Sequence, residues 1–180
     1  MTVDEYDTQS PTSLGHSIAN GGAGVAAAFY NTPTQAESFT SVGGVPILFN
    51  VDGTRKSTPE VRNQPRVTGP DGTNTTFFGS SDPESDGFPN FFGTSAAAPH
   101  VAAVAALQLQ GDPDLTPSQV YTGLADGALD IDDPGYDFRT GAGFVQADQT
   151  ITASTIANEP NIEVVPTALD FGTSFFDPDT

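Results

Sequence analysis

The pattern of apolar and polar positions along this 180-residue chain predicts short strands and loops in its first half. The compact apolar run 23–30 has the length of a buried strand, and residues 45–51, which lead into an Asp-Gly turn, predict a second strand. Prolines, glycines, Asp and Asn dominate residues 54–90. This composition favours irregular chain with one short strand near residues 65–68.

The second half begins with the clearest helix of the pattern. Residues 94–110 are rich in alanine and other helix formers, and Gly111-Asp112-Pro113 is a stop signal. A second helix is predicted to begin at Thr116-Pro117, with Thr as the N-cap and Pro in the first turn, and to end near Asp130. Its apolar face consists of Val120, Leu124, Ala128 and Leu129.

The end of the chain predicts a change of domain. Residues 141–145 indicate a tight turn, and residues 146–153 a last short helix. A linker over 155–161 follows, and residues 162–165 and 168–172 alternate apolar and polar positions as half-buried strands do. We therefore expect one domain over residues 1–154 and the start of a truncated β domain over 162–180, and the segment 162–172 resembles the opening strands of immunoglobulin-like domains.

Composition and charge exclude several classes of partner. The chain has 23 Asp and Glu against 5 Lys and Arg, a formal net charge of -18. Such a surface repels nucleic acid and anionic lipid, so we expect neither as a partner. No apolar run approaches the roughly 18 residues of a membrane span, and residues 1–15 lack the features of a signal peptide. There are no cysteines, which excludes disulfides and thiolate metal sites.

The segment 93–101, Gly-Thr-Ser-Ala-Ala-Ala-Pro-His-Val, carries the candidate chemistry. A nucleophilic serine needs exposure, a base and donors for the oxyanion that forms. Ser95 lies at the predicted helix start, where free backbone N–H groups and the helix dipole favour a developing negative charge. Gly93 leaves room for substrate backbone, and Thr94 is the expected helix cap. These features make Ser95 a candidate nucleophile and its own N–H a candidate oxyanion donor.

This segment resembles the active-site serine signature of subtilisin-like serine peptidases, the subtilase family. Residues 37–43 resemble the family's Ser-Phe-Ser-Ser-x-Gly segment, and residues 141–147 its Gly-x-Gly-x-Val-x-Ala segment. Residues 67–72 resemble its Val-x-Ala-Pro-Gly segment, with glycine in the alanine place and Asp71 inserted. The resemblance covers residues 14–153. It implies an α/β fold, the C-terminal portion of a subtilisin-like domain with a parallel sheet flanked by helices, and a polypeptide substrate.

Three groups that the family uses for catalysis are absent before Ser95. The resemblance implies a catalytic Asp, a His in a His-Gly-Thr context and an oxyanion Asn in a Gly-Asn context, and none of these contexts occurs. His100 lies about 140° around the helix from Ser95, so the two side chains cannot meet, and we expect it to pack. His16 matches no catalytic context. We expect a serine endopeptidase whose present part is a fragment, inactive alone and lacking the N-terminal part of its catalytic domain. The alternative is a non-catalytic module of a secreted or cell-surface binding protein.

Other candidate sites favour structural roles. Two clusters of acidic residues could hold a cation: Asp82, Glu84 and Asp86, and Asp130, Asp132, Asp133 and Asp137. The family often uses calcium, but neither cluster fits an EF-hand loop, so no site is identified and no metal or other cofactor is predicted.

Asn74 opens an Asn-Thr-Thr glycosylation triplet. We expect the parent protein to be extracellular or on the cell surface. A phenylalanine cluster that either packs the loop or lines a cleft comprises Phe77, Phe78, Phe88, Phe91 and Phe92.

Overall fold

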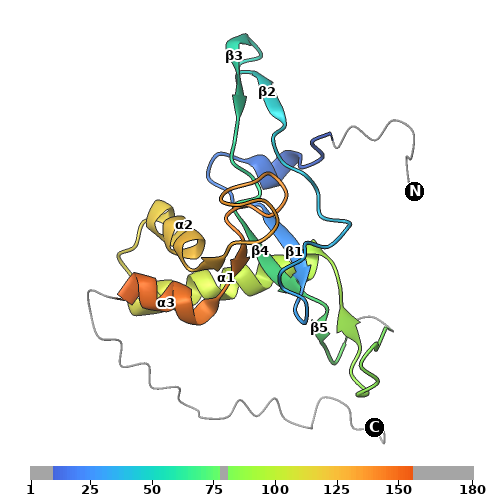
Figure 1. The fold of residues 1–180 in the computed structure, drawn as a ribbon. Helices are drawn as coiled ribbons and strands as arrows, with labels where there is room; N and C mark the ends of the chain where they lie inside the picture. The colour runs from blue at the N-terminus through green and yellow to red at the C-terminus, as the bar shows by residue number, and fades with distance from the viewer. Residues whose placement is uncertain (1–9, 78–80, 156–180) are drawn as a thin grey trace, which may run out of the picture.

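A four-stranded sheet forms the centre of the computed structural model, which describes residues 10–77 and 81–155. Its strand order is β1-β4-β8-β7, and Figure 1 shows β1 and β4 side by side. The β1–β4 and β4–β8 pairs are parallel, and β7 runs antiparallel to β8. The predicted α/β class with a parallel sheet is therefore confirmed. The strands are β1 (Val25–Phe29), β4 (Val67–Asp71), β7 (Ala128–Leu129) and β8 (Phe144–Val145).

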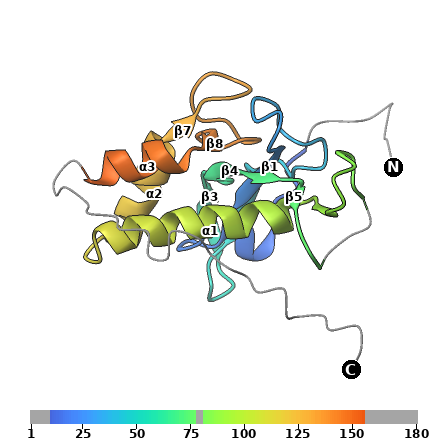
Figure 2. The same cartoon turned by 90° about the horizontal axis from the view of Figure 1, so that it is seen from below.

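Three helices pack beside this sheet. Helix α1 contacts β1 and β4, and α2 and α3 contact α1 and each other. Figure 2 shows α1 extended along one face of the sheet, with α2 and α3 beside its C-terminal half. No helix in the described parts of the chain is long and apolar enough to cross a membrane. The helices are α1 (Thr94–Gly111), α2 (Pro117–Asp126) and α3 (Ala147–Thr155), and a 3-10 turn, η1, covers Gly15–Ile18.

The core is small and joins the helices to the sheet. Its buried cluster combines β4, β8, α1 and α2. Burial at Val120 and Leu124 agrees with the predicted apolar face of the second helix. The buried cluster consists of Val67, Val101, Val120, Leu124 and Val145.

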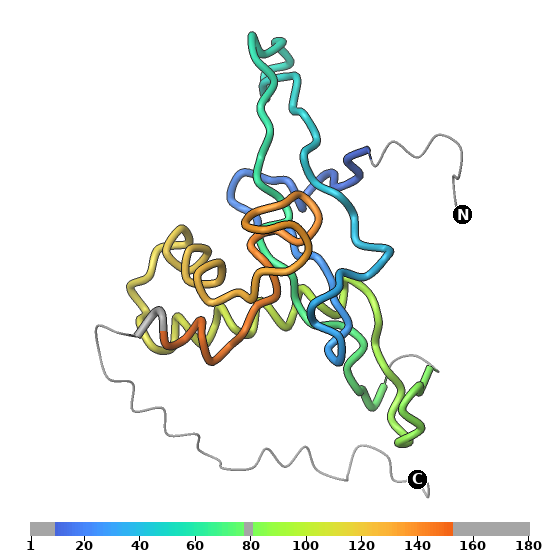
Figure 3. The backbone as a smooth tube through the Cα atoms, in the orientation of Figure 1, coloured from blue at the N-terminus to red at the C-terminus, as the bar shows by residue number. Residues whose placement is uncertain are grey.

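A long hairpin projects from the sheet (Figures 1 and 3). It pairs β2 (Pro46–Phe49) with β3 (Arg55–Val61). The strand expected over 45–51 is confirmed, but the expectation of irregular chain at β3 is wrong. Strand β3 exposes both faces, so its sequence shows no apolar alternation, and Lys56 and Glu60 form a 2.9 Å ion pair along it.

Two further boundaries differ from the sequence prediction. Helix α2 ends at Asp126, and Ala128 and Leu129, assigned to its apolar face, instead form β7. The tight turn expected at 141–145 contains β8, because Phe144 pairs with Leu129 and with Thr68. These strands are two residues long and depend on pairing with distant residues, which local periodicity does not reveal.

The remaining strands and segments complete the description. The predicted strand near 65–68 lies slightly later, at β4. A short antiparallel pair joins β5 (Thr73–Asn74) to β6 (Asn90–Phe91), within the region expected to be irregular. The predicted last helix is confirmed as α3. The predicted β segment 162–180 and nearly all of the predicted linker lie outside the described residues, as does Phe78.

Candidate active site

Ser95 is the second residue of α1, and its side chain is exposed. The N-cap is Gly93, with φ 120° and ψ 160°, a conformation that side-chain-bearing residues rarely adopt. The Gly93 carbonyl accepts the N–H groups of Ala96 and Ala97 at 2.8 and 3.2 Å. The expectation that Thr94 caps the helix is wrong, because it is the first helical residue and no side chain caps this end.

The Ser95 N–H precedes the first backbone bonds of α1. Within residues 10–77 and 81–155, neither this N–H nor the Ser95 hydroxyl has a hydrogen-bond partner. The free N–H lies at the positive end of an 18-residue helix. Both groups are therefore available to a ligand that approaches the helix start.

A buried carboxylate lies beneath this helix start. Asp71, at the end of β4, is 0% exposed, and its Oδ2 accepts the Gly93 N–H at 2.7 Å. Burial raises the pKa of Asp71, although the Gly93 hydrogen bond opposes the shift. Burial, together with the charge of Asp71, also raises the pKa of Glu37. In the sequence Asp71 stands out only as a residue inserted into a family segment, and a carboxylate at the end of a short strand is the available signal.

A cavity of about 290 Å³ opens next to the nucleophile segment. Thr94 lines one side of it, and the chain before η1 lines another. Leu14 contributes an apolar side chain that is 65% exposed, and Ser41 comes from the loop after β1. The space therefore adjoins the start of α1, at the residue before Ser95.

The two histidines are the candidate bases that the sequence offers for Ser95. His100 Nδ1 hydrogen-bonds with the Ala96 carbonyl at 2.7 Å, one helical turn earlier, which is a structural contact. His16 lies in η1 and is exposed. Neither ring hydrogen-bonds with Ser95 in the described part of the chain. In this part of the chain, neither histidine is therefore hydrogen-bonded to Ser95 as a base would be.

The acidic clusters organise loops. Asp82 accepts the N–H groups of Asp86 and Gly87, and Asp137 accepts those of Arg139 and Thr140. Among the residues that the structure describes, no three His, Cys, Asp or Glu side chains converge as a metal site would require.

The phenylalanines divide between packing and exposure. Phe92 packs against Phe29, with ring centroids 5.6 Å apart, beside the helix start. Phe77 and Phe88 are 80% and 49% exposed and line a separate cavity of about 510 Å³ together with Asn74. The Asn74 amide donates to Asp86 and accepts from Asn90, so its side chain is engaged within the loop.

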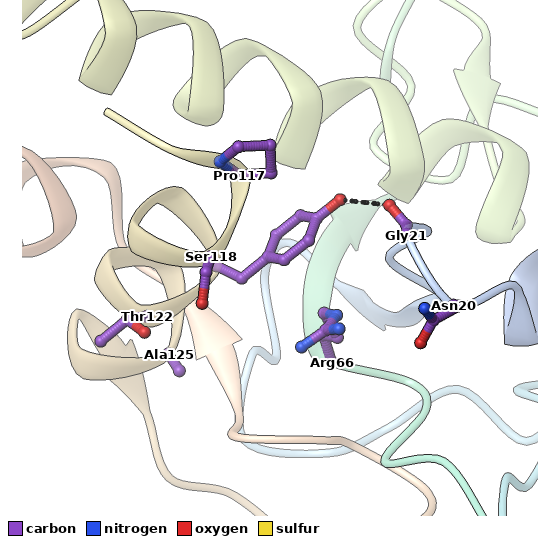
Figure 4. A pocket seen from close by; sticks show the side chains of 8 residues that line it. Asn20, Gly21, Arg66, Pro117, Ser118, Thr122 and Ala125 are labelled. Carbon is purple, nitrogen blue, oxygen red and sulfur yellow. Dashed lines mark hydrogen bonds between the residues drawn. The ribbon is translucent and has the colours of Figure 1, made fainter. Parts of the chain in front are cut away.

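A cavity of about 560 Å³ lies between α2 and the loop before β1 (Figure 4). The Arg66 guanidinium stacks over the Tyr121 ring at 4.4 Å, and the Tyr121 hydroxyl donates to the Gly21 carbonyl at 2.8 Å. None of the residues that line it belongs to the segment 93–101. We therefore interpret these contacts as the joint that docks α2 on the sheet.

Comparison with known proteins shows the family to which this chain belongs. The model of the Subtilase family matches residues 4–143. A subtilisin-like protease of Arabidopsis thaliana, SBT2.3, is 37% identical over 103 residues, which cover 54% of this chain and 12% of that protein. Fervidolysin of Fervidobacterium pennivorans is 33% identical over 102 residues, covering 56% of this chain and 15% of fervidolysin. The chain thus spans a small part of the length of the curated relatives it matches.

Solved structures agree with this result. The crystal structure of fervidolysin, a keratinolytic enzyme related to subtilisin, aligns with a TM-score of 0.52 and 26% identity, over 73% of this chain and 19% of that one. The CspB protease of Clostridium perfringens has the same TM-score at 22% identity, over 74% of this chain and 27% of its own, and supports the fold alone.

Proposed function

Because this chain belongs to the subtilase family of serine peptidases, we propose that it presents Ser95 as the nucleophile of an endopeptidase. The observation that carries the proposal is the exposed Ser95 at the start of α1, with its hydroxyl and its N–H both free of partners among the described residues. The substrate is a polypeptide, and we propose that cleavage takes place outside the cell or at its surface.

The reaction that suits this geometry is acyl transfer. The Ser95 hydroxyl oxygen attacks the peptide carbonyl carbon while a base takes the hydroxyl proton, and the carbonyl oxygen becomes an oxyanion. The Ser95 N–H and the N-terminal end of α1 stabilise that charge. The intermediate then expels the amine, which receives the proton, and water releases the acyl group from Ser95.

We propose that polypeptide outside the described residues supplies the base, its Asp partner and a side-chain oxyanion donor. The exposed face of α1 supports this, because it is apolar over three turns. A helix that is apolar on all sides is typical of a buried helix, and here α1 is covered on one side only. The exposed apolar positions are Ala98, Pro99, Ala102, Ala103, Ala106 and Leu107. We therefore expect the isolated chain to lack peptidase activity.

Labelling with a fluorophosphonate tests the proposal, since this reagent reacts with activated serines. The complete peptidase, including its upstream region, is labelled beside the isolated 180-residue chain. Ser118 offers a matched control, because it is exposed and is the second residue of α2, as Ser95 is of α1. We expect label on the complete protein and on Ser118→Ala, none on Ser95→Ala, and none on the isolated chain.

Each alternative predicts a different pattern. Label that persists in Ser95→Ala contradicts the assignment of the nucleophile. Label on the isolated chain contradicts its inactivity. A complete protein that folds but takes no label favours the non-catalytic binding module.

A further inference from the structure

We propose that Asp71 is a positioning residue for the nucleophile, whose carboxylate holds the peptide before Gly93 and thereby sets the direction in which Ser95 leaves the backbone. This inference rests on the proposed function of Ser95. Asp71 is also the residue inserted in this chain's counterpart of the family's Val-x-Ala-Pro-Gly segment.

The sheet aims Asp71 at the helix start. Side chains alternate across a strand, so Gly69 and Asp71 of β4 point to the same face. A Cβ built on Gly69 would meet Ala97 and Val101, which identifies that face as the one packed on α1. Asp71, two residues further along β4, therefore lies beneath the first residues of α1, where its Oδ2 accepts the Gly93 N–H.

Two anchors fix the backbone of Gly93. Its N–H is bound by Asp71, and its carbonyl is bound by the N–H groups of Ala96 and Ala97. Glycine at φ 120° has wide conformational freedom, so the peptide on its N-terminal side depends on the Asp71 contact for its orientation. Since Ser95 follows two residues later, a rotation of that peptide moves the nucleophile.

The surroundings of Asp71 make this contact costly for stability. The side chain is fully buried, and within the described residues its Oδ1 has no hydrogen-bond partner. Glu37 is the titratable side chain whose charge interacts with it, and the effect is repulsive. Burying a carboxylate with one unpaired oxygen beside another acid opposes folding. Such a group is understandable where it orders the backbone of a catalytic residue.

The test measures kcat and KM for a peptide substrate in the complete peptidase, with enzyme concentration set by active-site titration so that misfolded protein does not count. Asp71→Ala removes the acceptor, and Asp71→Asn keeps an oxygen in its place. Thr68→Val is the control, since it removes another fully buried hydrogen bond of β4, to the Thr140 carbonyl at 2.8 Å. Thermal unfolding of each variant is measured alongside.

We expect Asp71→Ala to lower kcat per active site by about 10- to 100-fold, with KM changed by less than about 3-fold. Asp71→Asn should keep its kcat within about 5-fold of the parent, because its amide oxygen can still accept the Gly93 N–H. The remaining loss is expected because a neutral acceptor makes a weaker hydrogen bond than a carboxylate. Thr68→Val should lose thermal stability and keep its kcat. Should Asp71→Ala not fold, Asp71→Thr serves in its place, since its hydroxyl is too short to replace the carboxylate, and the same loss is expected.

The proposal is overturned if kcat per active site is unchanged in the variant without an acceptor, or if Asp71→Asn is as impaired as Asp71→Ala. Failure of the proposed function looks different. In that case Ser95→Ala keeps its label and its activity, whereas a parent with Ser95-dependent activity and an unaffected Asp71→Ala variant refutes the role of Asp71 alone.

Discussion

Substitution of Gly69 by alanine should displace α1 from the sheet. The added Cβ would lie 2.7 Å from the Ala97 carbonyl oxygen and 2.8 Å from Val101 Cγ2. Ordinary contact begins at 3.4 Å, so the oxygen is about 0.7 Å too close. That oxygen belongs to the helix backbone and cannot rotate away. Helix α1 must therefore move, and Ala97 is only two residues from Ser95.

The expected effect is on both stability and catalysis. Overpacking a close-packed core costs typically about 1–3 kcal/mol of unfolding free energy. A displacement of about 1 Å at a reacting group can cost about 100-fold in rate, so a shift of this size should lower the labelling rate of Ser95 by about 10-fold or more. Glycine at this position therefore permits the close approach of β4 and α1 in this chain.

Urea unfolding and the fluorophosphonate labelling rate, both in the complete peptidase, measure the two effects. Gly21→Ala is the matched control, because a Cβ added there has no atom within 4 Å and its φ is not in the left-handed region. It should keep the parent labelling rate and unfold within about 1 kcal/mol of the parent. A Gly69→Ala protein that unfolds and labels like the parent would refute the close contact between strand and helix.

Two further predictions concern stability. Thr116→Ala should destabilise the protein by about 1 kcal/mol in urea unfolding, because Thr116 and Gln119 form a capping box at α2. Thr122→Ala, at an exposed position of the same helix, should change the unfolding free energy by less than about 0.5 kcal/mol. Equal losses in the two variants would contradict the role of the cap. The raised pKa of Asp71 means that the unfolded chain releases this proton at a lower pH than the folded one, so the parent loses stability relative to Asp71→Asn as pH rises from about 4. Melting temperatures should therefore favour Asp71→Asn at pH 7 and converge below about pH 4, and a gap that widens on acidification would show the opposite shift.

Elements with strong local signals could be predicted from the sequence. The alanine-rich run and its Gly-Asp-Pro stop define α1, the Thr-Pro start defines α2, and the apolar run defines β1. Strand β3 could not be predicted, because a hairpin exposed on both faces has no reason to alternate apolar and polar residues. Strands β7 and β8 exist through pairing across a long connection, so Ala128 and Leu129 looked like a continuation of the helix.

The candidate site divides in the same way. Ser95 could be placed at a helix start from its immediate neighbours, since the glycine before it and the alanines after it are all local. The bond from Gly93 to Asp71 joins residues 22 positions apart and becomes visible only when β4 and α1 are packed together. Local sequence thus predicts which residue reacts, while the support of its backbone requires the fold.

Presentation and activation of the serine are separable in this chain. Asp71 binds the backbone N–H of Gly93, two residues before Ser95. Because its Oδ2 is engaged by that bond and its side chain is buried, it orients the backbone and takes no proton from the serine. Variants of Gly69 and Asp71 should therefore slow the reaction only when a base is present to activate Ser95. In a Ser95→Ala background the same substitutions should still change the free energy of unfolding but have no activity left to change. Stability responds in both backgrounds, whereas the reaction rate responds only where Ser95 is present. The contributions of the β4–α1 contact to stability and to rate can therefore be measured separately.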